Sequence, residues 1–208
     1  MKIPETAFFC TCEDAYLVPS IITLESIRQF HPDADCFIMG TFKQPNFLEW
    51  IGKFSIRYIP IRETDFFQDT YLIKDHTPMW PRECFWHLFT YHYLKEMGYS
   101  RSCCVDGDVL CVSPINMAEV FDSTTPLSVV HKRNGSINSG VLFYNHDMME
   151  ELKFSHLIKD FYQNPTHLQA WLFARESRQL PLKYLSYYVW IFVFLTSIFA
   201  LLLLTSQT

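Results

Sequence analysis

Two carboxylates lie one residue apart inside an apolar stretch of the chain, where residues 103–110 read CCVDGDVL. Burying an ionised carboxylate is costly unless a cation or hydrogen-bond donors replace the lost water. Mg²⁺ and Mn²⁺ take oxygen ligands and share them with phosphate groups. Asp106 and Asp108 therefore predict a divalent metal site, and Gly107 between them permits a bend and a close ligand approach. A polar turn between two strands is the plainer interpretation.

A second polar segment, Asn138-Ser139-Gly140, precedes another apolar run. The short side chains of Asn and Ser can form hydrogen bonds with a hydroxyl-rich ligand. Glycine lets the backbone approach that ligand closely. The segment therefore indicates a sugar-binding element, with a simple hairpin turn as the alternative.

Alternating apolar runs and helical spacings predict the elements that must position these residues. Asp14 is expected to cap the first helix, and Gly98 to end the third. The alternation favours an α/β fold, with a sheet flanked by helices. We expect strands at 7–12, 35–40, 55–61, 102–112 (with a break at 106–108), 127–131 and 140–145, and helices at 18–30, 46–53, 82–97, 148–163 and 167–176.

Composition places the chain among globular proteins and excludes some functions. The 208 residues are 49% hydrophobic and 19% charged, which suits one domain with a sizeable core. A net charge of -5 argues against a general nucleic-acid binder, which would present a basic face. A phosphate-binding loop of the form GxxxxGK[ST] is absent from the sequence, so a nucleotide hydrolase of that class is not expected.

Seven cysteines are present, and none forms a C-x-x-C pair. Their odd number and apolar surroundings predict buried free thiols rather than disulfides. Zinc is a poor alternative because the paired ligand spacing is missing. Free thiols suit a reducing compartment such as the cytosol.

The C-terminal end differs sharply from the rest of the chain. Tyr187 to Leu204 is almost wholly apolar, and about 18 such residues can span a bilayer core as a helix. Basic residues precede this stretch, so the positive-inside rule puts the folded domain in the cytosol, and no signal peptide is expected at the N-terminus. We therefore expect a domain over 1–184 and a single-pass membrane anchor over 185–208. A buried core helix is the alternative for the tail.

The D-x-D and N-S-G segments, in that order, resemble those of GT-A fold glycosyltransferases. The closest resemblance is to family 8, the group of glycogenin and bacterial lipopolysaccharide galactosyltransferases, and it covers roughly Ala7 to Tyr184. It implies a Rossmann-like mixed sheet flanked by helices, followed here by the C-terminal hydrophobic helix. It also implies Mn²⁺- or Mg²⁺-dependent transfer of a sugar, with retention, from a UDP-linked nucleotide-diphosphate sugar to a hydroxyl of a glycan, protein or lipid.

The same resemblance assigns further residues to the donor. Thr11, Cys12, Glu13 and Tyr16 match the family's nucleotide loop, which holds uridine with Tyr16 near the base. Arg82 lies where the family often has a basic residue that contacts the diphosphate or sugar. A solvated arginine at a helix start is the alternative for Arg82. Asn138, Ser139 and Gly140 would contact the donor sugar.

Two family motifs are altered. The Asp-Gln pair near the anomeric carbon is matched by His167-Leu168-Gln169, which keeps Gln169 as a catalytic candidate and lacks the aspartate. The terminal His-x-x-Gly-x-x-Lys-Pro motif, whose histidine completes the metal site, is absent. Asp106 would then need water, phosphate or another side chain to fill the metal's coordination. An inactive or weakly active membrane-tethered binding protein, or a nucleotidyl or phosphoryl transferase, are the alternative functions.

Overall fold

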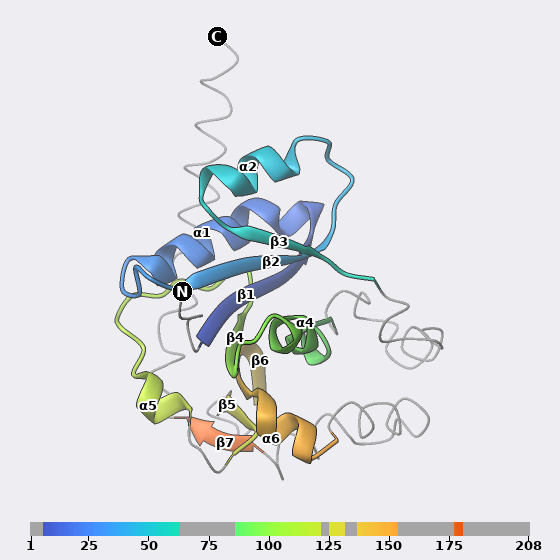
Figure 1. Ribbon diagram of the computed structural model, residues 1–208. Helices are drawn as coiled ribbons and strands as arrows, with labels where there is room; N and C mark the ends of the chain where they lie inside the picture. The colour runs from blue at the N-terminus through green and yellow to red at the C-terminus, as the bar shows by residue number, and fades with distance from the viewer. Residues whose placement is uncertain (1–5, 63–85, 122–124, 132–136, 154–176, 181–208) are drawn as a thin grey trace.

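A seven-stranded mixed sheet forms the centre of the protein (Figure 1). The computed structural model describes residues 6–62, 86–121, 125–131, 137–153 and 177–180. The strands follow the order β3-β2-β1-β4-β6-β5-β7 across the sheet. The expected α/β sheet flanked by helices is confirmed. The strands are β1 (Thr6–Glu13), β2 (Asp35–Thr41), β3 (Arg57–Pro60), β4 (Arg101–Val105), β5 (Leu127–His131), β6 (Ile137–Asn145) and β7 (Ser177–Leu180).

Strand direction divides the sheet. β1 runs parallel to both β2 and β4, and β3 runs parallel to β2. β6 runs antiparallel to β4 and to β5, whereas β7 runs parallel to β5. The central strands are apolar on both faces, as expected for parallel strands covered by helices on each side.

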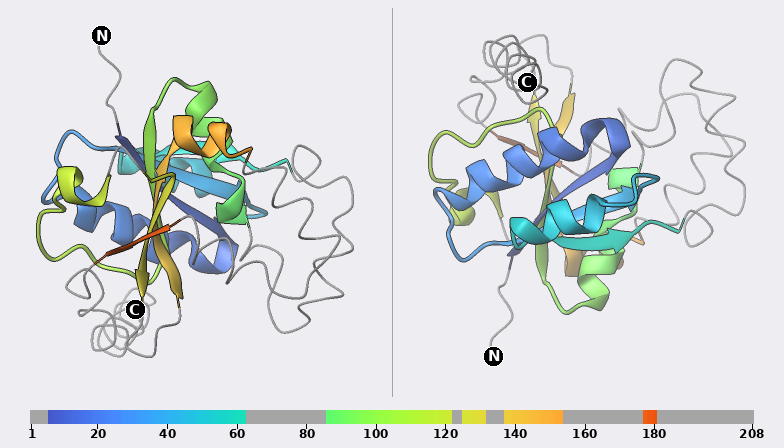
Figure 2. Two further views of the ribbon diagram at one scale, coloured as in Figure 1. Left: turned by 90° about the horizontal axis from the view of Figure 1, so that it is seen from below. Right: turned by 90° about the horizontal axis from the view of Figure 1, so that it is seen from above.

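Helices cover the two faces of the sheet (Figure 2). Residues such as Phe8 and Cys10 face the cluster that contains α1, whereas Ala7 and Phe9 face the cluster that contains α4 and α6. The alternation of these faces follows from the two-residue repeat of a strand. The helical elements are η1 (Asp14–Tyr16), α1 (Leu17–Arg28), α2 (Phe47–Lys53), α4 (Tyr91–Glu96), α5 (Met117–Val120) and α6 (His146–Glu151).

The α4 helix is shorter than the expected 82–97. Its described part begins with a tight turn at 86–88, and the α-helix starts only at Tyr91. Trp86, Leu88, Phe89 and Tyr91 are all buried, and a single α-helical face could not bury residues at this spacing. The predicted end is confirmed, because Gly98 has a φ of 92° and its amide donates to the Lys95 carbonyl.

The expected strand over 102–112 is wrong in its second half. β4 ends at Val105, and the chain turns at Asp106 so that the Val109 amide donates to the Asp106 carbonyl over 3.2 Å. Val109 is buried in the cluster on the α1 face, outside any strand. Val109 therefore buries on the α1 face rather than continuing the strand.

The later helices were only partly predicted. The helix expected at 148–163 begins earlier as α6 and ends at Glu151, with 154–163 outside the described residues. The helix expected at 167–176 and the tail at 185–208 also lie outside them. The elements η1, α5 and β7 were not expected from the sequence.

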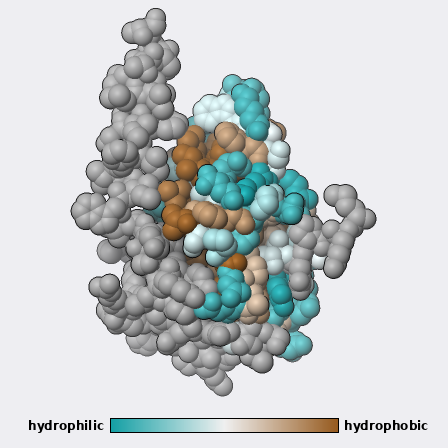
Figure 3. All heavy atoms as spheres, turned by 90° about the vertical axis from the view of Figure 1, so that its left-hand side faces the viewer, coloured by the Kyte–Doolittle hydropathy of each residue, from teal (hydrophilic) through white to brown (hydrophobic). Residues whose placement is uncertain are grey.

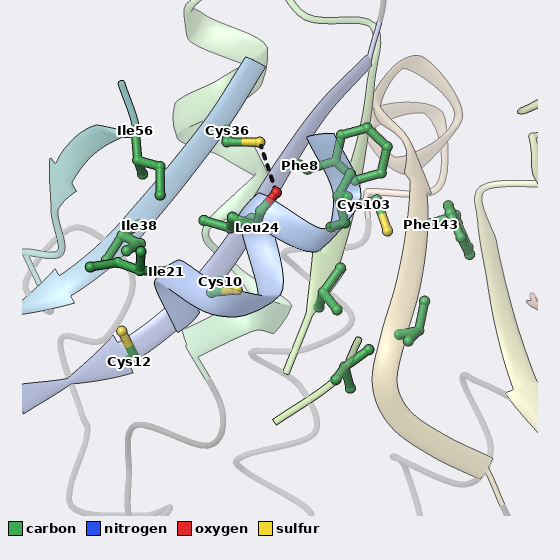
Figure 4. Packing of buried hydrophobic residues seen from close by; sticks show 14 of the residues in the cluster. Phe8, Cys10, Cys12, Ile21, Leu24, Cys36, Ile38, Ile56, Cys103 and Phe143 are labelled. Carbon is green, nitrogen blue, oxygen red and sulfur yellow. Dashed lines mark hydrogen bonds between the residues drawn. The ribbon is translucent and has the colours of Figure 1, made fainter. Parts of the chain in front are cut away.

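Cysteine thiols line the α1 face of the sheet (Figure 4). All six cysteines in the described ranges are free, and five of them are buried, which confirms the prediction for that part of the chain. Burial raises the pKa of the Cys10 thiol well above its ordinary value, and it raises the pKa of Cys36 to about 11. These thiols therefore act as small apolar core residues at neutral pH.

The described surface mixes polar and apolar residues, as the face in Figure 3 shows. Large apolar side chains are exposed on α2 and the turn after it, at Leu48, Trp50 and Phe54. Among the described helices, none is both long enough and apolar enough to span a membrane.

Candidate functional site

Four strands have an end at the same edge of the sheet. β1, β2 and β4 are parallel, so their carboxyl ends lie at the same edge, and the antiparallel β6 begins there. β1 separates the part of the sheet built from β2 and β3 from the part built from β4 onward. In open α/β sheets, ligands bind outside the carboxyl ends of the strands at such a switch point. The edge beside β1 and β4 is therefore the candidate site.

The structure brings the D-x-D and N-S-G segments into contact there. The amide of Asp106 donates to the carbonyl of Gly140 over 2.8 Å, just beyond the paired residues Val105 and Val141. This hydrogen bond continues the β4–β6 ladder by one step. It places the carboxylate-bearing turn directly beside the N-S-G segment.

The N-S-G segment lies inside β6, rather than before a strand as expected. The β5–β6 pairing changes register, from Val129 opposite Leu142 to Val130 opposite Asn138. Residues 139–141 of β6 therefore have no partner on β5. Such irregularities bend a strand and are common beside active sites.

The two carboxylates form an electrostatically unfavourable pair. Both Asp106 and Asp108 retain solvent exposure. Even so, protein atoms surround the Asp106 carboxyl closely enough that desolvation raises its pKa to about 6, with the charge of Asp108 as the second cause. A ligand from solvent can thus reach a carboxylate whose charge is only partly hydrated.

The donor atoms fit a hard divalent cation. Asp106 and Asp108 offer only oxygen ligands, and a bound cation would relieve the repulsion between them. The described residues contain no group of three or more His, Cys, Asp or Glu side chains that could hold a metal. Mg²⁺-type sites commonly use one or two carboxylates, with phosphate and water as the other ligands.

The predicted nucleotide loop lies at the end of β1. Glu13 is exposed, and Tyr16 in η1 is 50% exposed, so its ring is not part of the hydrophobic core. Thr11 is partly buried on the strand itself. The Cys12 side chain is buried in the core, which leaves its backbone as the part available to a ligand.

Asp14 does not cap the first helix, contrary to the prediction. No side-chain capping bond is present at the start of η1 or of α1. The Asp14 carboxylate instead accepts the amides of Lys43 and Gln44, over 3.1–3.2 Å. It therefore ties the turn after β1 to the loop after β2, a contact between segments that local spacing cannot reveal.

Residues of α1 that the sequence analysis overlooked contact the carboxylate turn. The Thr23 hydroxyl donates to the Gly107 carbonyl over 3.0 Å, and the Cys111 amide donates to Ser26 Oγ over 2.9 Å. The sequence held one indication of these contacts, because both residues are hydroxyl residues at positions of the helix that face the core.

Several predicted site residues remain without a structural account. Arg82 and Gln169 lie outside the described residues. Asn138 and Ser139 are placed by their backbone in β6. Their roles toward the donor stay predictions.

Comparison with known proteins identifies the fold. No family model matches the sequence, and no curated protein sequence matches it. Solved structures do match, among them the glycosyltransferase GlyE of Streptococcus pneumoniae TIGR4, with 13% identity, a TM-score of 0.63, and coverage of 88% of this chain and 47% of that one. An active-site mutant of LgtC matches with 14% identity and a TM-score of 0.62, over 86% of this chain and 73% of that one. Mouse xyloside xylosyltransferase 1 matches with 11% identity and a TM-score of 0.52, over 78% of this chain and 74% of that one.

The chain thus spans about half the length of GlyE and about three quarters of the other two proteins. Identities this low establish shared architecture rather than shared chemistry. The seven-stranded mixed sheet with helices on both faces is the GT-A fold of these glycosyltransferase structures.

Proposed function

We propose that this protein is a metal-dependent glycosyltransferase. It moves a sugar from a nucleotide-diphosphate sugar, UDP-linked, to an acceptor hydroxyl on a glycan, protein or lipid, with retention at the anomeric carbon. The observation that carries the proposal is the paired carboxylate turn, which lies beside the N-S-G segment at the switch point of the sheet. The GT-A fold supports the same conclusion, and LgtC has been seen with donor and acceptor sugar analogs.

Asp106 and Asp108 would hold Mn²⁺ or Mg²⁺. When bound by these two residues, the ion would supply Lewis-acid stabilisation for the negative charge of the departing diphosphate. The raised pKa of Asp106 supports this assignment, because a nearby cation would offset both the desolvation of this carboxylate and its repulsion by Asp108.

The end of β1 would bind the nucleotide. Tyr16 offers an exposed aromatic ring on which uracil can stack. Asp14 holds the neighbouring loop through the amides of Lys43 and Gln44. Backbone groups of Thr11, Cys12 and Glu13 would complete the contact.

The remaining roles concern the sugar and diphosphate. Asn138, Ser139 and Gly140 would contact the sugar hydroxyls; Gly140 accepts the Asp106 amide, and the other two residues precede it on β6. Arg82 would contact the diphosphate, and Gln169 would lie near the anomeric carbon. These two assignments rest on the family resemblance.

We also propose that Tyr187 to Leu204 anchors the protein in a membrane, with the catalytic domain in the cytosol. The support is the uncharged, apolar sequence of this stretch and the basic residues before it. A chain that ends at Lys183 should stay soluble and folded without detergent. Aggregation of that shorter chain, with full-length protein soluble without detergent, would show that the tail belongs to the core.

The activity test uses the full chain and a panel of nucleotide-diphosphate sugars. We expect nucleoside diphosphate to be released from one or more UDP-sugars with Mn²⁺, and release to stop when EDTA is added. Analysis of the products shows whether a sugar or a nucleotide is transferred, which separates this function from a nucleotidyl transferase.

Binding measurements make the test decisive. Calorimetry should detect UDP binding that requires Mn²⁺. Metal-dependent UDP binding without turnover of any donor would identify a binding protein instead. No metal-dependent binding of UDP or any other nucleotide would contradict the proposed site.

A further inference from the structure

Three hydroxyl side chains form a row along the buried face of α1. Ser20, Thr23 and Ser26 recur every third residue, and their exposed fractions are 0%, 1% and 8%. All other buried residues of this helix are apolar. Buried hydroxyl groups need hydrogen-bond partners, so their contacts report what the row is for.

The row packs against the segment that follows β4. The Thr23 hydroxyl donates to the Gly107 carbonyl over 3.0 Å. The Ser26 hydroxyl donates to the Thr23 carbonyl over 2.6 Å and accepts the Cys111 amide over 2.9 Å. Two hydroxyls of one helix thus hold both ends of the segment 107–111.

Ser20 brings the helix and the turn into close contact. A Cβ atom at Gly107 would stand 2.5 Å from Ser20 Oγ and 3.3 Å from the Ser20 amide nitrogen. A side chain there would require the Ser20 hydroxyl to rotate away and would still make a tight contact with the Ser20 backbone, so glycine fits this position best. Thr23 therefore meets a Gly107 peptide that is already pressed against α1.

The opposite side of the turn is held by the sheet. The Asp106 amide donates to the Gly140 carbonyl over 2.8 Å. The peptides before and after Asp106 and Gly107 are thus fixed by β6 on one side and by α1 on the other. The two carboxylates themselves are exposed, and this clamp fixes the backbone from which they project.

We propose that Thr23 is a positioning residue for the metal site, acting through the Gly107 carbonyl. This inference rests on the proposed metal binding by Asp106 and Asp108. The hydrogen bond from Thr23 restrains the peptide between Gly107 and Asp108, which lies between the two carboxylate side chains. Its loss widens the range of carboxylate separations and weakens cation binding.

The test compares Thr23→Val with Thr23→Ser in the full chain. Valine keeps the shape of threonine and removes the hydroxyl, whereas serine restores the donor. Mn²⁺ alone is the probe, and its dissociation constant is measured by electron paramagnetic resonance. We expect about a tenfold loss of affinity in Thr23→Val, the lower end of the range for residues that support metal ligands, and recovery in Thr23→Ser.

Ser102→Ala is the matched control for lost stability. Ser102 is a buried hydroxyl at the opposite end of β4, where it bonds to His146 over 2.8 Å. Melting temperatures of all variants are measured beside the affinities. We expect Ser102→Ala to lower the melting temperature while leaving the Mn²⁺ affinity unchanged.

Two results would overturn the inference while leaving the metal site intact: wild-type affinity in Thr23→Val, or an equal loss of affinity in Ser102→Ala. Absence of Mn²⁺ binding by the wild-type chain is a different outcome. It would overturn the metal site, and the role of Thr23 with it.

Discussion

The ionisable groups at the two ends of β4 lie in opposite environments. At the amino end, His146 is fully buried; its Nδ1–H donates to the Tyr99 carbonyl over 2.7 Å, and its Nε2 accepts from Ser102. At the carboxyl end, Asp106 can be reached from solvent, yet desolvation and the charge of Asp108 both raise its pKa. One end has its polar groups satisfied by the protein, while the other keeps an electrostatic cost that a ligand can remove. This contrast separates the part of the strand that stabilises the fold from the part available for function.

The largest effect is expected from Asp108→Asn, which removes one of the two carboxylates at the carboxyl end of β4. Loss of one of two carboxylates should weaken Mn²⁺-dependent UDP binding by more than about 100-fold, because ligand losses exceed those of supporting residues. The pKa of Asp106 should also fall, since the neighbouring charge is gone. Calorimetry and carboxyl NMR titration measure these effects. Unchanged UDP affinity in the presence of metal would refute the assignment.

The amino end can be tested through pH. Burial lowers the pKa of His146 to about 4, so between its unfolded value of about 6.5 and this value only the unfolded chain is protonated. His146 therefore has no effect on the pH dependence of the free energy of unfolding above about pH 6.5. As the pH falls from there towards 4, the protonation of His146 in the unfolded chain lowers the free energy of unfolding by about 3 kcal/mol in total. Urea unfolding of wild type and His146→Gln at several pH values measures it. An identical pH slope in the variant would contradict the assignment to His146.

Gly107→Ala probes how tightly the carboxyl end is packed. The added methyl group would meet Ser20, and such overpacking costs about 1–3 kcal/mol of the free energy of unfolding. Mn²⁺ affinity should fall as well, because the turn must shift. Gly52→Ala in α2 is the matched control, since nothing lies within 4 Å of its added Cβ and alanine favours a helix by about 1 kcal/mol. Similar stability changes in the two variants would argue against the close packing.

The smallest effect is expected at Tyr16, which lies at the same edge of the sheet as the carboxylates. Loss of base stacking in Tyr16→Ala should raise the donor KM roughly tenfold and change kcat less. Tyr16→Phe keeps the ring and should retain most of the affinity. Steady-state kinetics with the preferred donor decide, and a drop in kcat alone would place Tyr16 outside the base site.

Strands with continuous apolar runs could be predicted from sequence almost to the residue. β1, β2 and β5 lie close to or at their expected bounds. β4 was extended too far because Val109 is as apolar as the strand residues, and composition does not distinguish burial against α1 from pairing in a sheet. The register change at Val130 is likewise invisible locally, because it depends on where β5 and β6 meet.

The candidate site shows the same division. The carboxylates were found because ionisable groups in an apolar run require compensation. Asp14 was assigned to the wrong partner because its acceptor role involves amides 29 and 30 positions away. Thr23 was overlooked because a hydroxyl on a helix also occurs where nothing depends on it, and its contact with Gly107 spans 84 positions.

The order of strands in the sheet has a consequence for biosynthesis. β1 precedes both β2 and β4 in the chain and lies between them in the sheet. Its pairing with β2 begins 28 positions later (7 to 35), whereas its pairing with β4 spans 95 positions (6 to 101). Until β4 has been synthesised, one edge of an apolar β1 stays open, and open apolar edges favour aggregation. Folding of the nascent chain should therefore depend on how quickly the ribosome reaches residue 105, and this interval is where a chaperone would have the largest effect on yield.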